Sequence, residues 1–221
     1  MRCIAHRGFA ETYPENTVAA VRAATDHTES VEIDVRRCGS GDLVVIHDRR
    51  VDRVTEGTGR VADHSRAKLA EMDVLGSGEG VPTLEAVFRA APAATFVLDC
   101  KETGVVADAL DLADDFDVSV TVSAFEVDIL ETAAEAGNVP LAYLAEAGAA
   151  RTGLETASAL GCAAIHPHWT ACVDELVSEA HDSGLEVNAW TVPSRRDATA
   201  LDHVDVDGCI VDRPEVVFER D

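Results

Sequence analysis

The chain opens with Cys3-Ile4-Ala5-His6-Arg7-Gly8, a short apolar run that ends in a histidine and an arginine. Short apolar runs of this kind are typical of strands that are buried on both faces of a parallel sheet. In an α/β barrel, the catalytic side chains lie where the strands end. His6 and Arg7 are therefore the first candidate functional residues, and Gly8 is expected to turn the chain.

Apolar, β-branched runs alternate with alanine-rich helical stretches along the rest of the chain, which favours parallel βα units. Eight strands are expected, at residues 3–6, 31–35, 95–100, 119–123, 141–144, 163–166, 186–191 and 208–211. Seven helices are expected between them, at residues 16–26, 83–91, 104–115, 127–136, 153–160, 173–183 and 194–201. This pattern predicts an α/β fold, a TIM (β/α)8 barrel, as a single domain over residues 1–221, with residues 49–82 as a small insertion over the barrel mouth.

One further apolar run, residues 43–46, follows the second strand too closely for a parallel crossover, which needs about a dozen residues or more. We therefore expect a β-hairpin at this point. With its turn centred between Gly39 and Ser40, Glu32 would lie opposite His47, and the hairpin would bring His47 back beside the carboxylates.

Glu32 and Asp34 are two residues apart on a strand, so their side chains project from the same face. Two carboxylates that face a low-dielectric interior repel each other, and one takes up a proton unless a cation lies between them. Asp99 ends the next strand and can supply a third carboxylate. Such oxygen ligands suit Mg²⁺ or Ca²⁺. The alternative is a solvated strand of alternating charge, which would place the carboxylates under the helices.

His6 and His47 are the candidate acid and base, because histidine exchanges protons near neutral pH. The guanidinium of Arg7 suits a pair of phosphate oxygens, although an ion pair with Glu15 is the simpler alternative. Lys101, one of only two lysines in the chain, lies two residues beyond the third carboxylate. Its ammonium could balance the carboxylates or hold a phosphate.

Phe125 and Trp190 lie at predicted strand ends and are candidates for lining the alcohol pocket, with core packing as the equal alternative. His166 and His168 end another strand and could contact substrate. The six cysteines show no CxxC spacing and lie mostly in apolar runs. We expect them to be reduced and buried, and no zinc site is expected.

Ordered motifs extend from one end of the chain to the other. They are His6-Arg7-Gly8, Pro14-Glu15-Asn16-Thr17, Glu32-Ile33-Asp34, His47-Asp48, Pro82-Thr83-Leu84-Glu85, Leu98-Asp99-Cys100-Lys101, Val122-Ser123-Ala124-Phe125, Trp190-Thr191-Val192 and Asp207-Gly208-Cys209-Ile210-Val211-Asp212-Arg213-Pro214. In order and spacing they resemble the glycerophosphodiester phosphodiesterase family. The resemblance implies a metal-dependent TIM-barrel enzyme that hydrolyses glycerophosphodiesters to an alcohol and glycerol 3-phosphate.

The resemblance also implies a role for each site residue. His6 and His47 become the general acid and base. The metal ligands would be Glu32, Asp34 and Asp99. The substrate phosphate would be bound by Arg7 and Lys101. The family usually has glutamate at the third ligand position, whereas related sphingomyelinase-D-like enzymes have aspartate there. A phospholipase D-like activity is therefore an alternative, and a non-catalytic phosphodiester-binding module is a second one.

The net charge of −23, from 41 acidic and 18 basic residues, limits the partners. No basic cluster is expected, which argues against nucleic acid and anionic membranes and favours a small-molecule substrate. No apolar run reaches about 18 residues, so no membrane span is expected, and the first strand leaves no room for a signal peptide. We expect a cytoplasmic protein, and the sequence does not predict its oligomeric state. Strong acidity with two lysines is typical of halophiles, in which salt screens self-repulsion.

Overall fold

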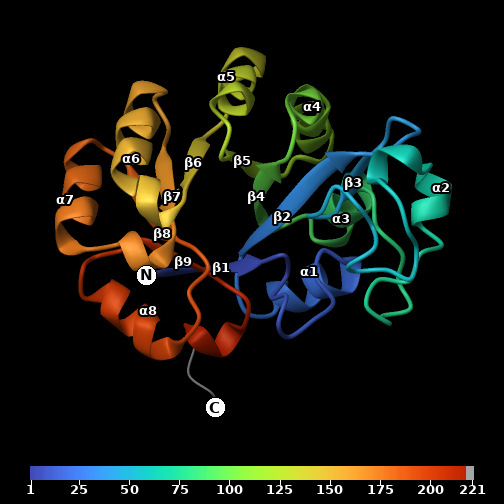
Figure 1. Cartoon of the computed structure of the whole chain (residues 1–221), viewed down its shortest axis with the longest axis horizontal. Helices are drawn as coiled ribbons and strands as arrows, with labels where there is room; N and C mark the ends of the chain where they lie inside the picture. The colour runs from blue at the N-terminus through green and yellow to red at the C-terminus, as the bar shows by residue number, and fades with distance from the viewer. Residues whose placement is uncertain (218–221) are drawn as a thin grey trace.

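Eight parallel strands form a closed barrel ringed by helices in the computed structural model, which describes residues 1–217 (Figure 1). The barrel strands are β1 (Arg2–His6), β2 (Ser30–Arg37), β4 (Thr95–Cys100), β5 (Ser119–Ala124), β6 (Leu141–Ala145), β7 (Ala164–Pro167), β8 (Glu186–Ala189) and β9 (Gly208–Val211). The barrel closes because β1 pairs in parallel with both β2 and β9. The predicted TIM barrel is confirmed.

The seven expected helices are all present, each within a few residues of its predicted bounds. They are α1 (Val18–Thr25), α3 (Leu84–Ala90), α4 (Val106–Phe116), α5 (Val127–Ala136), α6 (Ala150–Ala159), α7 (Asp174–Asp182) and α8 (Arg195–Asp202). Short 3₁₀ turns occur at η2 (Thr103–Val105), η3 (Ala147–Ala149), η4 (Trp169–Ala171) and η5 (Pro214–Val216). Helix α1 begins after Thr17, whose side chain accepts a hydrogen bond from the Ala20 N–H and so satisfies one of the free donors of the first turn.

Strand β2 shows how the barrel separates apolar from charged side chains. Val31, Ile33 and Val35 are fully buried and belong to the main core between the strands and the surrounding helices. Glu32 and Asp34 alternate with them, so they face the barrel interior. The carboxylates therefore share the inner face, as their spacing predicts.

The loop after β1 brings the chain close to helix α1. Gly8 has a φ of +77°, and a Cβ at this position would lie 2.8 Å from the backbone carbonyl carbon of Ala20. Both the left-handed conformation and the close approach favour glycine. Gly8 therefore does turn the chain, and it also lets the Arg7 backbone lie against the first helix.

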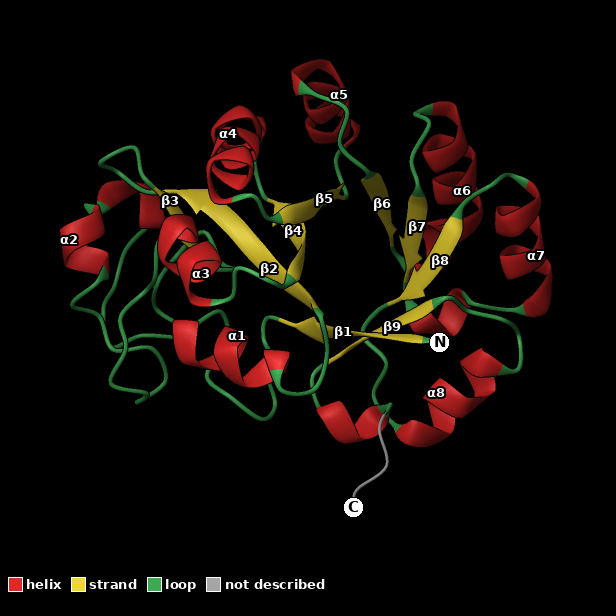
Figure 2. Ribbon diagram, turned by 180° about the vertical axis from the view of Figure 1, so that it is seen from behind, coloured by secondary structure: helices red, strands yellow, loops and turns green. Residues whose placement is uncertain are grey.

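Strand β3 (Leu43–Val45) pairs antiparallel with β2, so the expected hairpin is confirmed (Figure 2). The expected register, with Glu32 opposite His47, is wrong by one residue. Val35 pairs with Val45, which places Glu32 opposite a position one residue beyond His47 if the ladder is continued.

The turn causes this shift. The Cys38 N–H donates to the Asp42 carbonyl at 3.0 Å, and the three residues between them include Gly41 at a φ of +92°. An odd number of turn residues centres the hairpin on one residue rather than between two. The strand ends before the chain bends at His47, so strand alternation no longer dictates where that side chain points, and the imidazole still lines the barrel mouth.

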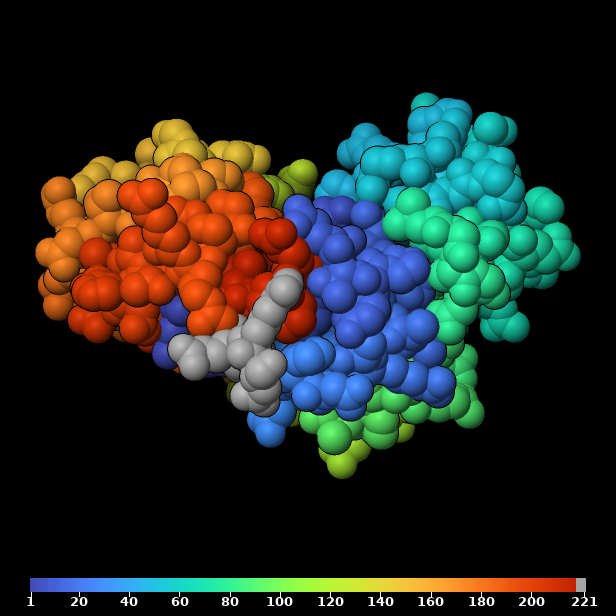
Figure 3. Space-filling view, turned by 90° about the horizontal axis from the view of Figure 1, so that it is seen from below, coloured from blue at the N-terminus to red at the C-terminus, as the bar shows by residue number. Residues whose placement is uncertain are grey.

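Residues 49–82 contain η1 (Val61–Asp63) and the short helix α2 (Arg66–Leu69), which the sequence did not predict. Their apolar side chains form a second core with those of the hairpin, comprising Cys38, Val44, Ile46, Val51, Val54, Val61, Leu69, Met72, Val74 and Val81. In Figure 3 this cyan-to-green segment forms a lobe at one side of the molecule. The lobe is thus packed on β3 rather than built into the barrel wall.

All six cysteines are free and buried, as expected. Among residues 1–217, no helix combines the length and the apolar character that crossing a membrane requires.

Candidate active site

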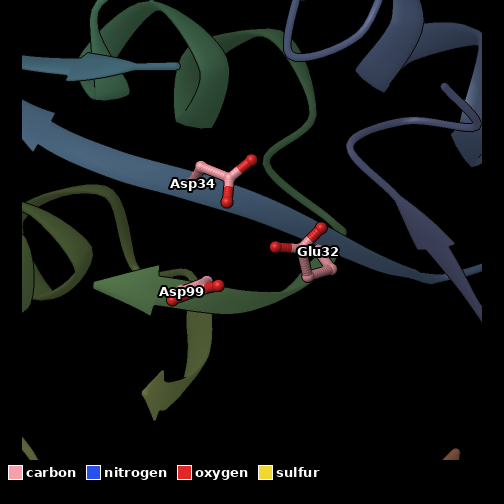
Figure 4. Close-up of side chains that lie close together, drawn as sticks. All are labelled: Glu32, Asp34 and Asp99. Carbon is pink, nitrogen blue, oxygen red and sulfur yellow. The ribbon is translucent and has the colours of Figure 1, made fainter. Parts of the chain in front are cut away.

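Three carboxylates meet at the carboxyl ends of β2 and β4. Glu32 and Asp34 come from β2 and Asp99 from β4, and Asp34 and Asp99 are direct partners in the parallel ladder (Figure 4). All three are buried, and one oxygen of each lies within 4.8 Å of the others. Across residues 1–217, no second group of metal-ligating side chains converges in this way.

The carboxylates have unlike proton affinities. Burial, reinforced by the charge of Asp34, raises the pKa of Glu32 to about 7. Burial likewise raises the pKa of Asp99 to about 6, although Lys101 opposes the rise. For Asp34, burial alone would raise the pKa, but Lys101 and Arg7 hold it well below its usual range. Two of the three carboxyl groups therefore hold a proton more tightly than a free carboxylic acid does, because they are buried and their charges repel each other. A divalent cation such as Mg²⁺ or Ca²⁺ would relieve the same repulsion, and the buried oxygen ligands fit it.

Arg7 and Lys101 lie against the carboxylates. Arg7 Nη1 bonds Glu15 at 2.9 Å, and its Nε lies 3.1 Å from Asp34. Its backbone N–H donates to Glu32 at 3.0 Å. Lys101 Nζ lies 2.8 Å from Asp34 and also contacts the third carboxylate. The ion pair with Glu15 thus exists, but it does not take Arg7 away from the cluster.

Each candidate catalytic histidine is held by its own aspartate. His6 Nδ1 lies 2.6 Å from Asp212, and His47 Nδ1 lies 2.6 Å from Asp48. A carboxylate at Nδ1 fixes the ring orientation and leaves Nε2 to exchange protons. In His6 that nitrogen lies 3.9 Å from Glu32, so the ring faces the acidic cluster.

The two imidazoles differ in their proton affinities. Burial lowers the pKa of His6, but the hydrogen bond to Asp212 and the charge of Glu32 outweigh it, and the net shift is upward. For His47, burial is the largest influence and the pKa falls below its usual value. His6 thus holds its proton more tightly than His47 does.

Arg53 ties the lobe to the site. Its Nε bonds Asp48 at 2.6 Å, and its two terminal nitrogens bond Glu15 at 2.7 and 2.9 Å. Because Asp48 orients His47 and Glu15 holds Arg7, one side chain of the lobe positions two candidate site residues. Charge-assisted pairs of this kind, partly shielded from water, are stronger than neutral hydrogen bonds.

A cavity of about 120 Å³ opens beside these groups. Seven of the nine predicted site residues line it, namely His6, Arg7, Glu32, His47, Asp99, Phe125 and Trp190. Phe125 and Trp190 meet edge to face with ring centres 5.6 Å apart. The remaining two, Asp34 and Lys101, do not line it but contact each other at 2.8 Å.

Two residues that line this cavity each have a buried side-chain atom with no hydrogen-bond partner among residues 1–217, Ser123 Oγ and His166 Nδ1. A chain of hydrogen bonds assigns the tautomer of His166. Arg2 donates to Asn188 Oδ1 at 3.1 Å, so the amide nitrogen of Asn188 faces His166 Nε2 at 3.0 Å and donates to it. His166 Nδ1 must then carry the proton, and it is a buried donor that no hydrogen bond uses.

Three residues of the site, Asp212, Arg53 and Ser123, were not predicted from the sequence. Asp212 follows β9, and its position at a strand end was a signal, but its pairing with His6 requires β9 to lie beside β1. Arg53 had no local signal because it lies in an irregular segment. Ser123 was noted only as part of a strand-end motif. His166 was predicted as a possible substrate contact together with His168, and of these two only His166 lines the cavity.

The model of the glycerophosphoryl diester phosphodiesterase family matches residues 6–216. A glycerophosphodiester phosphodiesterase of Caldanaerobacter subterraneus is 30% identical, over 97% of this chain and 95% of the relative. A phosphodiesterase of Oleispira antarctica, solved in complex with the product sn-glycerol-3-phosphate, superposes with a TM-score of 0.91 at 26% identity, over 97% of this chain and 94% of that one. The Thermotoga maritima structure, 23% identical over 97% of this chain and 95% of its own, has the same fold with a TM-score of 0.84.

We expect Asp212→Asn to lower kcat on a chromogenic phosphodiester by about 100-fold with little change in KM, because an amide cannot orient and charge-stabilise the His6 ring as a carboxylate does. Steady-state kinetics measure this. The matched control is Asp207→Asn, which alters the surface pair of His181 and Asp207 and should leave kcat unchanged. An unaltered kcat in Asp212→Asn would rule out a role for this dyad.

His166 should make the free energy of unfolding depend on pH. Burial lowers its pKa to about 3, whereas an unfolded imidazole titrates near about 6.5. Between these values the unfolded chain binds the extra proton, so stability falls as pH drops through this window and is complete above it. His166→Gln should reduce the slope by up to about 1.4 kcal/mol per pH unit.

Denaturant titrations of both proteins at pH 4.5, 5.5 and 7.5 measure this slope. Identical slopes for the two proteins would show that His166 is not held neutral by the fold.

Proposed function

Because the chain belongs to the glycerophosphoryl diester phosphodiesterase family, we propose that it hydrolyses glycerophosphodiesters to glycerol 3-phosphate and an alcohol. The observation that carries the proposal is the acidic cluster between two histidine–aspartate dyads, all at one cavity. Metal-assisted phosphoryl transfer needs these elements together: charge neutralisation at a phosphate oxygen and proton transfer on both sides of phosphorus.

We assign metal ligation to Glu32, Asp34 and Asp99. A divalent cation supplies Lewis-acid stabilisation of the charge that develops on a non-bridging phosphate oxygen. Arg7 supports the same charge from the cavity wall, and Lys101 keeps Asp34 ionised. The choice between Mg²⁺ and Ca²⁺ is left to experiment, since carboxylate oxygens bind both.

The two imidazoles perform the proton transfers. One of His6 and His47 accepts the proton of the nucleophile, which is water or the neighbouring glycerol hydroxyl, as its oxygen forms the new bond to phosphorus. The other donates a proton to the alcohol oxygen as the old bond breaks. Attack by the glycerol hydroxyl gives a cyclic phosphate, which water then opens with the roles exchanged. Asp212 and Asp48 keep both rings oriented throughout.

The unused polar atoms of the cavity suit a small alcohol. Ser123 and His166 line the cavity, and each has a buried polar atom that can take a hydroxyl group of the substrate as its partner once the side chain turns toward it. Phe125 and Trp190 supply an apolar wall beside them. A buried donor left without a partner is costly, so substrates that lack these hydroxyls should bind less well.

His6→Ala and His47→Ala should each lower kcat by about 100-fold or more, because each removes one proton-transfer group. Chelator should abolish turnover of glycerophosphocholine, and Mg²⁺ or Ca²⁺ should restore it. Phosphorus NMR measures the products, and His181→Ala, at a surface histidine, is the control. Full activity in either variant would refute the assignment.

The same spectra separate the competing activities. Glycerol 3-phosphate from glycerophosphocholine supports the proposal. Turnover of a lysophospholipid alone, with a lysophosphatidate or cyclic lipid product, would favour the phospholipase D-like activity. Binding of substrate without metal-dependent turnover would favour the non-catalytic module.

We also propose that the protein works in concentrated salt and in a reducing cytoplasm, which its net charge of −23 and six buried free cysteines support. Raising KCl from 0.1 to 1 M shortens the screening length from about 10 Å to about 3 Å. The thermal midpoint should therefore rise with KCl over this range, as measured by circular dichroism. A midpoint that stays constant or falls would contradict the adaptation to salt.

A further inference from the structure

A groove of about 480 Å³ beside the barrel mouth is lined mainly by cations. Its basic side chains are Arg36, Arg37, Arg49, Arg50, Arg60 and Lys101. These are six of the 18 basic residues in a chain that has 41 acidic ones, and Glu102 is the one carboxylate in the lining. The expectation that the chain has no basic cluster is therefore wrong.

Internal ion pairs do not account for this clustering. Arg37 pairs with Asp108 and Arg50 with Asp52, but Arg49 and Arg60 have no ion pair or side-chain hydrogen bond to any part of residues 1–217. Arg50 and Arg60 are moreover opposite each other in an antiparallel bridge. Like charges placed opposite each other destabilise such a pairing. Lys101 is balanced by Asp34 and Asp99, so within residues 1–217 the groove charge without a carboxylate or hydrogen-bond partner is that of Arg49 and Arg60.

The groove lies one step outside the acidic cluster. Asp34 and Asp99 are partners in the ladder between β2 and β4, and Arg36 and Lys101 follow them by two residues. Lys101 comes directly after β4, and its backbone N–H still donates to the Val35 carbonyl of β2 at 3.2 Å. Two residues of strand advance the chain by about 7 Å. Lys101 belongs to both sites, because it lines the groove and contacts Asp34. Arg36 Nε also donates to the His47 carbonyl at 2.8 Å.

We propose that this groove is a second anion subsite, which binds a phosphomonoester carried by the alcohol portion of the substrate. The inference rests on the proposed function and names a preferred substrate class: glycerophosphodiesters whose head group bears a further phosphate. The planar guanidinium of arginine can donate two parallel hydrogen bonds to the oxygens of such a group. The groove is concave and joins the acidic cluster through Lys101, and the net charge of −23 repels a long polyanion.

The test compares glycerophosphoinositol with glycerophosphoinositol 4-phosphate, which differ by one phosphomonoester. The variant is Arg49→Gln/Arg60→Gln, whose side chains are exposed and lie outside the proposed catalytic machinery. The control is Arg22→Gln/Arg196→Gln, which makes the same change of charge at exposed positions in α1 and α8. Measurements are kcat/KM with metal and, by calorimetry in chelator, the Kd for both compounds without turnover.

The parent enzyme should prefer the phosphorylated compound by about tenfold in both measurements, and the groove variant should lose this preference while the control keeps it. Unchanged kcat/KM for glycerophosphoinositol will show that the groove variant is folded. Equal losses on both compounds, or no preference in the parent, would overturn the inference. Groove-dependent binding of an oligonucleotide without discrimination between the two small compounds would also overturn it. Absence of all turnover would refute the proposed function, while the Kd values would still decide the role of the groove.

Discussion

Three carboxylates buried on the inner face of two adjacent parallel strands are the constraint around which the site is arranged. Glu32, Asp34 and Asp99 are brought together by strand pairing itself, and burying their charges is costly unless other groups compensate them. Arg7 and Lys101 compensate mainly Asp34, which stays ionised, whereas the pKa values of the other two rise. The fold thus holds buried carboxylate oxygens at the barrel mouth whose mutual repulsion a divalent cation would relieve.

The surrounding charges are ordered by distance from this cluster. Each histidine of the two dyads binds its aspartate through Nδ1, which leaves Nε2 free, and in His6 that nitrogen faces Glu32. One strand step further out, the sign of the charge reverses and the arginine groove begins. The lobe of residues 49–82 contributes both to a dyad and to the groove. Its Arg53 supports His47 through Asp48. Three more of its arginines line the groove, namely Arg49, Arg50 and Arg60. An insertion that looks peripheral therefore contributes to the architecture of the site.

Much of this could be predicted because strands impose strict local geometry. The two-residue period placed Glu32 and Asp34 on one face, and the position of polar residues after apolar runs located most of the cavity lining. The hairpin was predicted, but its register was not, since one additional turn residue moves every partner by one position. Asp212 was missed for a different reason: it lies 206 residues from His6, and only barrel closure makes them neighbours.

The sequence by itself determined the succession of strands and helices, the face on which the carboxylates lie and the family pattern, because these depend on periodicity and order along the chain. Only the tertiary structure decided which aspartate orients which histidine, that Arg53 joins the lobe to the site, which ring nitrogen of His166 carries the proton, and that scattered arginines form one groove. Those features are contacts between residues distant in sequence. They exist because β1 closes on β9 and the hairpin turns on a single residue, and neither event leaves a local trace in composition or spacing.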